Sequence, residues 1–277
     1  MRIIEIDVKH AIHDSGLPEM GYSVNPYLGC FHGCLYCFAI DFTAIREARE
    51  NWGEVVVVKR NFIDVLTKDI RNIQRKTVGV STITDPYQPV EAKYRLTRKS
   101  LELLLSNGFR VTLQSKSPLV LRDIDLLMRY SNKADVGFTI THPDPGKAIL
   151  LETQTPSPLM RAQALRMLSQ SGIRTWIYFG PIIQGFNDGT KEIEGIAQIA
   201  ADTGSRVIYD FYNPYTSSLK LLSSAGFHDV IGSRQWRERV KTEIERIFSL
   251  YGLDFNSQSE DYVAESKLIN RTLEDFS

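Results

Sequence analysis

The sequence is poor in cysteine, in net charge and in long hydrophobic runs. Its 277 residues contain only three cysteines, and Lys plus Arg equal Asp plus Glu at 33 each, so the formal net charge is zero. A disulfide framework uses an even number of cysteines spread over the fold, so cysteine usage favours a reducing cytosol. Zero net charge removes the overall electrostatic attraction for nucleic acid, although a local basic patch remains compatible with it.

No segment of the sequence resembles a targeting signal or a membrane span. The chain starts with the short segment Met1–Val8, which is interrupted by charges. We therefore expect neither a signal peptide nor a transmembrane helix, no membrane partner, and a cytoplasmic location. With 43% hydrophobic residues, the chain can still bury the core of one large domain or of two small ones.

The three cysteines lie within eight residues, with the spacing C-x3-C-x2-C, as Cys30, Cys34 and Cys37. Three thiolates can bind three irons of a [4Fe–4S] cube and leave the fourth iron open to another ligand. An open iron is where a substrate or cofactor can meet an electron source. Gly29 and Gly33 would let the loop backbone fold tightly around such a cube. The motif therefore predicts a redox site.

A structural zinc site is the main alternative for this loop. Zinc needs four closed ligands, so His32 or a distant histidine would have to complete the set. The histidines show no finger-like spacing; they are His10, His13, His32, His142 and His228. Three inert core cysteines would more naturally be scattered along the chain. A non-enzymatic binding module stabilised by zinc or by a cluster stays open as an alternative.

Short apolar runs alternate with segments of helical period through most of the chain. The predicted strands are 55–59, 78–82, 110–114, 135–141, 173–179 and 205–211, with helices between them. Such alternation implies parallel strands joined by right-handed crossovers. Six or so βα units fall short of the eight in a closed TIM barrel. Helical spacing over 236–251 predicts a further helix that packs across the barrel or its rim.

Four sequence motifs are more specific than the cysteine spacing. In chain order they are Asn25-Pro-Tyr-x-Gly-Cys, Thr84-Asp-Pro-Tyr-Gln-Pro-Val-Glu91, Gln114-Ser-Lys-Ser-Pro118 and Gly180-Pro-Ile-Ile-x-Gly-Phe-Asn-Asp188. Together with the cysteine loop, they resemble the group of radical S-adenosylmethionine (SAM) enzymes that is related to spore photoproduct lyase. The resemblance implies an α/β fold, a partial (β/α)6 TIM-like barrel. We expect an N-terminal extension over 1–20, the barrel over 21–215 and a C-terminal helical extension over 216–277.

The resemblance also implies a cofactor set and a reaction. Cys30, Cys34 and Cys37 would bind one [4Fe–4S] cluster, and SAM would bind its open iron. One electron, from a donor of ferredoxin or flavodoxin type, would cleave SAM reductively to methionine and a 5′-deoxyadenosyl radical. That radical abstracts hydrogen from a substrate carbon, which needs a dry, closed pocket.

Five residues match SAM-contacting positions of this group. Lys116 matches the residue that pairs with the SAM carboxylate, a role suited to a compact ammonium. Thr84 and Thr139 match hydroxyl-bearing contacts, the latter near the ribose. Tyr36 and Gly180 match positions that contact adenine. Each has a plainer alternative: an exposed lysine, a hydroxyl that hydrogen-bonds within a strand, or a glycine needed by a turn.

The candidates for catalysis on the substrate side are Asp85, Tyr87 and His142. The proline-rich segment 85–91 reads either as a rigid turn or as a loop that faces the substrate cavity. We predict the second, with four side chains directed to the cavity: Asp85, Tyr87, Gln88 and Glu91. His142 follows the strand that carries Thr139 and is a candidate proton donor or substrate contact, or else a loop histidine satisfied by backbone groups.

The sequence departs from spore photoproduct lyase at the residues that return a hydrogen atom to the product. That enzyme uses a cysteine and a tyrosine, whereas alignment places Thr82 and Phe38 at these positions. Neither side chain donates a hydrogen atom as a thiol or phenol does, although Tyr87 and Tyr178 remain phenolic candidates by type. We therefore predict a small-molecule, peptide or protein substrate. A nucleic-acid substrate, with lesion repair as the reaction, is the alternative.

Overall fold

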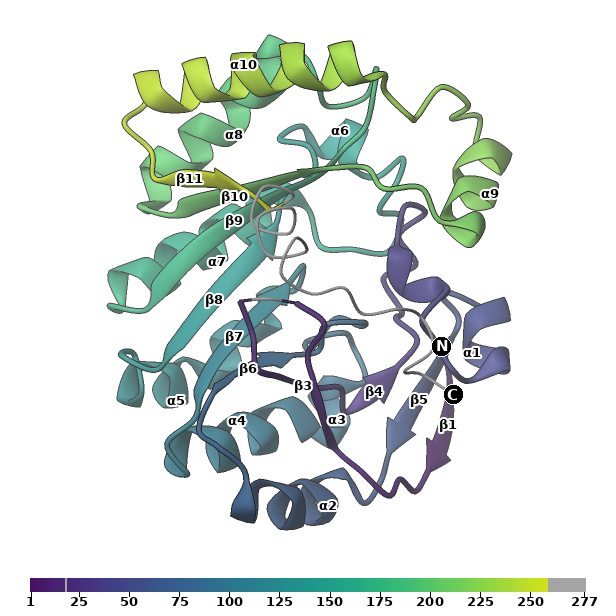
Figure 1. The fold of residues 1–277 in the computed structure, drawn as a ribbon, viewed down its shortest axis with the longest axis vertical. Coiled ribbons are helices and arrows are strands. Elements are labelled where there is room, and N and C mark those ends of the chain that lie inside the picture. Colours follow the sequence, from purple (N-terminus) through teal and green to yellow (C-terminus); the bar gives the residue numbers. More distant parts are fainter. Residues whose placement is uncertain (18, 259–277) are drawn as a thin grey trace.

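The fold is known from a computed structural model that describes residues 1–17 and 19–258. A curved eight-stranded sheet dominates it, in the order β11-β10-β9-β8-β7-β6-β3-β2 (Figure 1). Six consecutive parallel strands form the wall of a partial barrel: β3 (Tyr22–Val24), β6 (Thr77–Val80), β7 (Arg110–Ser115), β8 (Ala134–Thr139), β9 (Arg174–Ile182) and β10 (Arg206–Phe211). The predicted α/β partial barrel is confirmed.

Helices cover the outer face of this sheet. They are α2 (Phe62–Asp69), α4 (Leu96–Ser106), α5 (Ile124–Arg129), α7 (Pro158–Gln170) and α8 (Thr190–Thr203) (Figure 1). Helix α7 begins as its sequence predicts, because the Ser157 hydroxyl accepts a hydrogen bond from the Met160 N–H and proline occupies the first turn. Short helices lie in the connections: α1 (Arg46–Glu50), α3 (Glu91–Tyr94) and α6 (Pro145–Ala148).

The predicted strand at 55–59 exists but does not belong to the barrel. It is β5 (Val55–Lys59), which pairs with β1 (Arg2–Ile6) and β4 (Tyr27–Leu28) in a separate three-stranded sheet. The first barrel strand is instead β3, which lies next to β6 and pairs on its other side with the antiparallel β2 (Ile12–Asp14). A run of β-branched residues predicts a buried strand but not its pairing partner. The strand at 55–59 was therefore predicted correctly, but its place among the barrel strands was wrong.

The segment that follows the barrel contains a strand as well as helices. After α9 (Thr216–Ser224) and α10 (Arg234–Leu250), β11 (Phe255–Ser257) pairs in parallel with β10 at the edge of the sheet. Helix α10 lies outside α8 (Figure 1), and its Trp236 ring packs against Phe211, with ring centroids 5.3 Å apart. Residues 259–277 of the expected extension lie outside the described residues, and the domain boundaries stay predictions.

The two faces of the barrel sheet differ sharply in chemistry. Side chains that point outward to the helices are apolar and at most 2% exposed; they are Val78, Val80, Val111, Leu113, Val136, Phe138, Ile177, Phe179, Val207 and Tyr209. The alternate, inward positions carry glycines and mostly polar residues: Gly79, Thr112, Gln114, Asp135, Gly137, Thr139, Trp176, Tyr178, Ile208 and Asp210. The barrel interior is therefore a polar chamber. In the described part of the chain, no helix is long and apolar enough to cross a bilayer.

Candidate active site

The cysteine loop follows β4 and lies against the carboxyl ends of the barrel strands. Cys30 and Cys34 are buried and Cys37 is half-buried, all with free thiols. All three line one cavity of about 2080 Å³, together with residues from the inner face of the sheet. The loop turns at Gly29, where φ is +71° and a Cβ would lie 2.5 Å from the Val55 carbonyl oxygen. Only glycine fits this turn.

Hydrogen bonds from the loop after β6 hold the cysteine loop in place. The Thr84 hydroxyl donates to the Gly29 carbonyl at 2.7 Å, and the Gln88 amide donates to the same oxygen at 3.1 Å. The Gln88 amide oxygen accepts from the Phe31 N–H at 2.9 Å. The Thr84 hydroxyl is thus engaged with the loop backbone, and a direct contact between it and SAM stays a prediction. We expected Gln88 to face the cavity, but it does not line it, because both ends of its amide hydrogen-bond to the cysteine loop.

Asp85 joins three segments in the wall of the cavity. Its carboxylate accepts hydrogen bonds from the Ser115 hydroxyl at 2.8 Å, the Tyr87 N–H at 2.8 Å and the Lys116 N–H at 2.7 Å. His32 lies 3.3 Å from the same carboxylate. Burial acts to raise the pKa of Asp85, but the His32 imidazolium together with the N–H and ammonium of Lys116 outweighs it and lowers that pKa to about 2. Asp85 lines the cavity, but most of its hydrogen-bonding capacity is used to position β6 and β7.

Tyr87 and Glu91 lie behind the cavity wall, which corrects the expectation that they face the substrate. Both are fully buried and neither lines the cavity. The Tyr87 hydroxyl donates to Asp123 at 3.1 Å, and the Glu91 carboxylate pairs with Arg122 at 2.7 Å. Both partners lie in the 3-10 turn Pro118–Asp123 that precedes α5, so the proline-containing segment directs these polar groups away from the cavity. Tyr87 therefore has no access to a substrate in this cavity.

His142 is also separated from the main cavity. It lines a smaller one, of about 420 Å³, with Lys147, Phe186 and Glu192. Its Nδ1 accepts from the Asp144 N–H at 3.0 Å, its Nε2 lies 3.8 Å from Glu192, and its ring packs against Phe186. The alternative of a loop histidine satisfied by a backbone group describes this position, so the expected placement beside the substrate is corrected.

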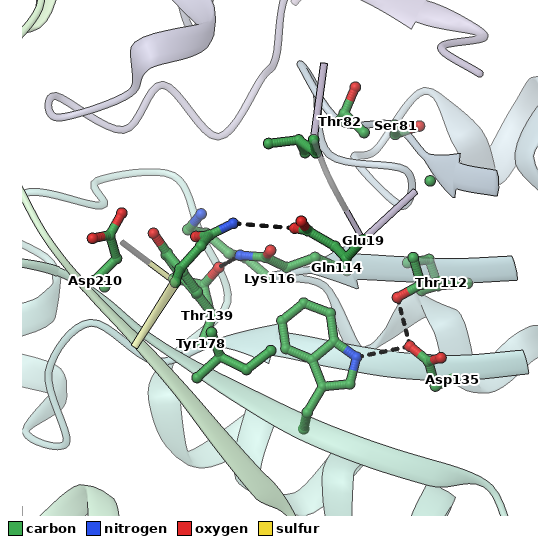
Figure 2. A pocket seen from close by; sticks show the side chains of 18 of the residues that line it. Glu19, Ser81, Thr82, Thr112, Gln114, Lys116, Asp135, Thr139, Tyr178 and Asp210 are labelled. Carbon is green, nitrogen blue, oxygen red and sulfur yellow. Dashed lines mark hydrogen bonds between the residues drawn. The ribbon is translucent and has the colours of Figure 1, made fainter. Parts of the chain in front are cut away.

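The other predicted cofactor-binding residues come together around the main cavity. Tyr36, Lys116, Thr139 and Gly180 all line it. Figure 2 shows Lys116 and Thr139 in this wall. The Lys116 ammonium lies 5.6 Å from the centre of the Tyr36 ring, and the Thr139 hydroxyl accepts from Gln114 at 2.7 Å. Residues from the cysteine loop, from β8 and β9, and from the position directly after β7 therefore surround the same space.

Sequence reasoning missed a buried charged pair beneath this group. Glu152 and Arg161 are 2.6 Å apart, and Arg161 also donates to the Thr139 carbonyl oxygen at 3.0 Å. The Tyr36 hydroxyl donates to Glu152, and the Thr141 hydroxyl donates to the same oxygen at 2.8 Å. This network links the cysteine loop to β8 and α7. A single glutamate in a loop and an arginine in a helix give no sequence signal for it.

The donors of the cysteine loop fit an iron–sulfur cube better than a single ion. In residues 1–17 and 19–258, no three Cys, His, Asp or Glu side chains converge as ligands of one metal ion. Thiolates that bind a cube each ligate a different iron, whereas structural zinc needs four donors around one ion. Burial raises the pKa of Cys34 to about 11, and the Lys116 ammonium acts against this rise. A bound metal would stabilise the thiolate further.

Comparisons with known proteins agree with this geometry. The family model described as "Radical SAM superfamily" matches residues 24–198. Among curated proteins, an uncharacterized protein of Methanocaldococcus jannaschii is 33% identical over 188 residues, which cover 68% of this chain and 70% of that protein. An uncharacterized protein of Acidianus two-tailed virus is 28% identical over 237 residues, which cover 81% of this chain and 75% of that protein.

Solved structures show the same fold. Spore photoproduct lyase complexed with dinucleoside spore photoproduct has a TM-score of 0.71 at 13% identity, covering 92% of this chain and 81% of its own. A radical SAM methyltransferase from Sphaerobacter thermophilus has a TM-score of 0.55 at 17% identity, covering 85% and 65%. Identities this low show likeness of fold alone. The family model, however, matches more than half of the sequence, and the chain therefore belongs to the radical SAM superfamily.

Proposed function

We propose that this radical SAM enzyme abstracts hydrogen from a small-molecule, peptide or protein substrate held in the barrel chamber. Membership of the superfamily implies a [4Fe–4S] cluster and SAM. The observation that carries the proposal is that the cysteine loop, Lys116, Thr139 and Gly180 line one cavity. This cavity continues along the polar inner face of the sheet, so a substrate there would lie beside the cofactor.

Each residue has a task that its position supports. Cys30, Cys34 and Cys37 would hold three irons of the cluster, and the Lys116 ammonium would pair with the SAM carboxylate. When bound, the cluster supplies the electron that cleaves SAM to methionine and a 5′-deoxyadenosyl radical, which takes hydrogen from the substrate.

Buried groups position the residues that would contact the adenosine part of SAM. Tyr36 and Gly180 would contact adenine, and Thr139 would contact the ribose. Hydrogen bonds from Tyr36 and Thr141 to Glu152 fix this wall before SAM binds. Such preorganisation limits the ordering that binding would otherwise require.

Lesion repair of the spore photoproduct lyase type remains the second candidate. The fold likeness favours it, but it does not establish the reaction. Thr82 lines the cavity and Phe38 is 45% exposed beside the cysteine loop, and neither side chain is a hydrogen-atom donor. Tyr178 lines the chamber and remains the phenolic candidate for such a step. These features favour a different substrate.

The cluster and SAM chemistry can be tested directly. Anaerobically reconstituted protein should hold about four irons per chain, and dithionite plus SAM should release 5′-deoxyadenosine. A Cys34→Ala variant should release none. Equal release from both proteins would refute the cluster assignment, and one zinc per chain after anaerobic purification would favour the binding-module alternative.

The SAM carboxylate contact has its own test. A Lys116→Ala variant should bind SAM more weakly by about 1–3 kcal/mol, because a charged hydrogen-bonding partner is lost. Isothermal titration with reconstituted protein measures this difference. Lys99→Ala, which removes an exposed lysine on α4, is the matched control. Unchanged affinity in Lys116→Ala would remove the proposed role.

A further inference from the structure

Ser81, at the end of β6, is a strained and unsatisfied residue in the cavity wall. It has a φ of +64°, which non-glycine residues rarely adopt, and it is only 6% exposed. Its hydroxyl has no hydrogen-bond partner among the described residues, although its N–H donates to the Val24 carbonyl oxygen at 2.7 Å. Buried strain and an orphaned polar group together mark positions that meet a ligand. Ser81 lines the main cavity (Figure 2).

Two aromatic rings on β9 lie flat against the inner face of the sheet. A Cβ on Gly137 would lie 2.3–2.5 Å from three adjoining atoms of the Trp176 indole, so this ring covers the glycine with its face. A Cβ on Gly180 would likewise lie 2.6 Å from the Tyr178 ring. Both rings line the cavity. The two glycines thus let the rings turn their open faces toward the chamber.

Carboxylates flank these rings on the neighbouring strands. One Asp135 oxygen accepts from the Thr112 hydroxyl at 2.5 Å and from the Trp176 indole N–H at 3.0 Å (Figure 2). Asp210, on β10, also lines the cavity near Tyr178 (Figure 2). Burial and the Asp210 charge raise the pKa of Tyr178 well above its usual range, so its phenol stays protonated.

Among the described residues, the basic side chains that line the cavity lie at its two ends. Lys116 is beside the cysteine loop, where it packs over Tyr36. Three exposed arginines begin strands at the opposite end; they are Arg110, Arg174 and Arg206. Arg206 pairs with Asp254 at 3.6 Å, and Arg110 donates to the Asn132 carbonyl oxygen. The middle of the chamber therefore combines carboxylates with aromatic faces, and this is the chemistry that binds organic cations.

We propose that the chamber between Ser81 and the Trp176–Tyr178 wall binds its substrate through a positively charged amine or guanidinium group. Asp135 and Asp210 supply the counter-charge, the ring faces supply cation–π contacts, and Ser81 hydrogen-bonds a neighbouring polar group of the ligand. A phosphodiester strand is disfavoured, since its charges would face the two carboxylates. This inference deepens the proposed function and rests on it for the reaction, but the binding step stands by itself.

Matched probes test the charge preference on the full chain, reconstituted with cluster and SAM. We choose N-acetyl-lysine methylamide against N-acetyl-norleucine methylamide, N-acetyl-arginine methylamide against its citrulline counterpart, and thymidylyl-thymidine as the nucleic-acid probe. Calorimetric titration should show at least one cationic probe binding 10-fold or more tightly than its neutral partner. Thymidylyl-thymidine should not compete. Equal affinity within both pairs, or stronger binding of the dinucleotide, overturns the proposal.

Variants then assign the preference to this wall. Asp135→Asn and Asp210→Asn should each reduce the cation preference several-fold, whereas Asp125→Asn, at an exposed carboxylate on α5, should leave it intact. Ser81→Gly removes the hydroxyl while relieving the backbone strain, so weaker binding by a stably folded Ser81→Gly protein supports a ligand contact. A preference unaltered in both aspartate variants contradicts the assignment.

The two proposals fail separately. Binding of the probes requires no radical chemistry, so absent 5′-deoxyadenosine release with a retained cation preference would refute only the reaction. Normal release of 5′-deoxyadenosine with no cation preference would refute only the substrate class.

Discussion

The outward and inward faces of the barrel sheet are made by alternate residues of the same strands, yet they follow different rules. Outward side chains form a continuous apolar core under the helices. Inward side chains are glycines, acids, amides and half-exposed aromatic rings around a cavity. In a closed TIM barrel, bulky branched side chains fill the interior. Here the apolar packing is concentrated on one face, and the other face lines a cavity.

The largest expected effect on stability is at the buried Glu152–Arg161 pair, which lies beneath the cavity wall. Glu152→Gln should lower the free energy of unfolding by about 3–5 kcal/mol, because it leaves Arg161 buried without a counter-charge. Chemical denaturation measures the difference. Glu47→Gln, which breaks an exposed pair with Arg2, is the control and should change it by less than about 0.5 kcal/mol. Similar values for both variants would contradict the buried network.

Two isoleucines on adjacent strands compare the faces directly. Ile177 on β9 points outward and is fully buried, whereas Ile208 on β10 points inward and lines the cavity. Ile177→Ala should cost about 2–5 kcal/mol of unfolding free energy through the lost contacts and the cavity it creates. Ile208→Ala should cost less than about 1 kcal/mol. Equal losses, measured by denaturant titration, would show that the interior is packed after all.

A substitution at Gly137 tests how closely the Trp176 indole packs against the inner face of the sheet. Gly137→Ala should destabilise the fold by about 1–3 kcal/mol, because the added methyl group overlaps the Trp176 indole. It should also shift the tryptophan fluorescence. Combining it with Trp176→Leu should recover part of the loss. Gly16→Ala, where nothing lies within 4 Å of the added group, serves as the neutral control.

The smallest expected effect is a loss of folding stability at low pH that comes from Glu152. Burial acts to raise the pKa of Glu152, but Arg161 and Lys116 outweigh it and lower that pKa to about 2. A depressed folded-state pKa stabilises the fold above the unfolded pKa of about 4.5, and this contribution is lost as pH falls through both values. Glu152 alone should account for less than about 1 kcal/mol of loss between pH 7 and pH 4. The slope should be shallower in Glu152→Gln; an identical slope would assign the acid loss elsewhere.

The sequence predicted the barrel, and it predicted that the cysteine loop and several strand-end residues share one cavity, better than it predicted where the substrate candidates lie. Strand alternation and the family resemblance predicted that Cys30, Lys116, Thr139 and Gly180 lie together, and all four line one cavity, because residues at the ends of parallel strands share one edge. The pattern could not show that β5 leaves the barrel, since partner choice depends on tertiary contacts. Nor could it find β11, because three residues are too short for a detectable period.

The predictions for the substrate-facing residues were wrong for a different reason. The motif around Asp85 predicts a functional loop, but the direction of each side chain depends on which buried partner it finds. The Tyr87 hydroxyl donates to the buried Asp123, so this side chain packs behind the cavity wall instead of lining the cavity. At Ser81 the structure shows a feature that the sequence did not predict, because a positive φ at a serine has no signature in a single sequence.

The pairing of β11 with β10 has a consequence for synthesis on the ribosome. Every other strand of the large sheet is translated before β11, and β10 keeps an open hydrogen-bonding edge until residues 255–257 emerge. An open edge is a template for pairing with another chain. A nascent chain that stalls after α10 would therefore expose β10 to neighbouring molecules, and release of the last strand is the event that ends this hazard.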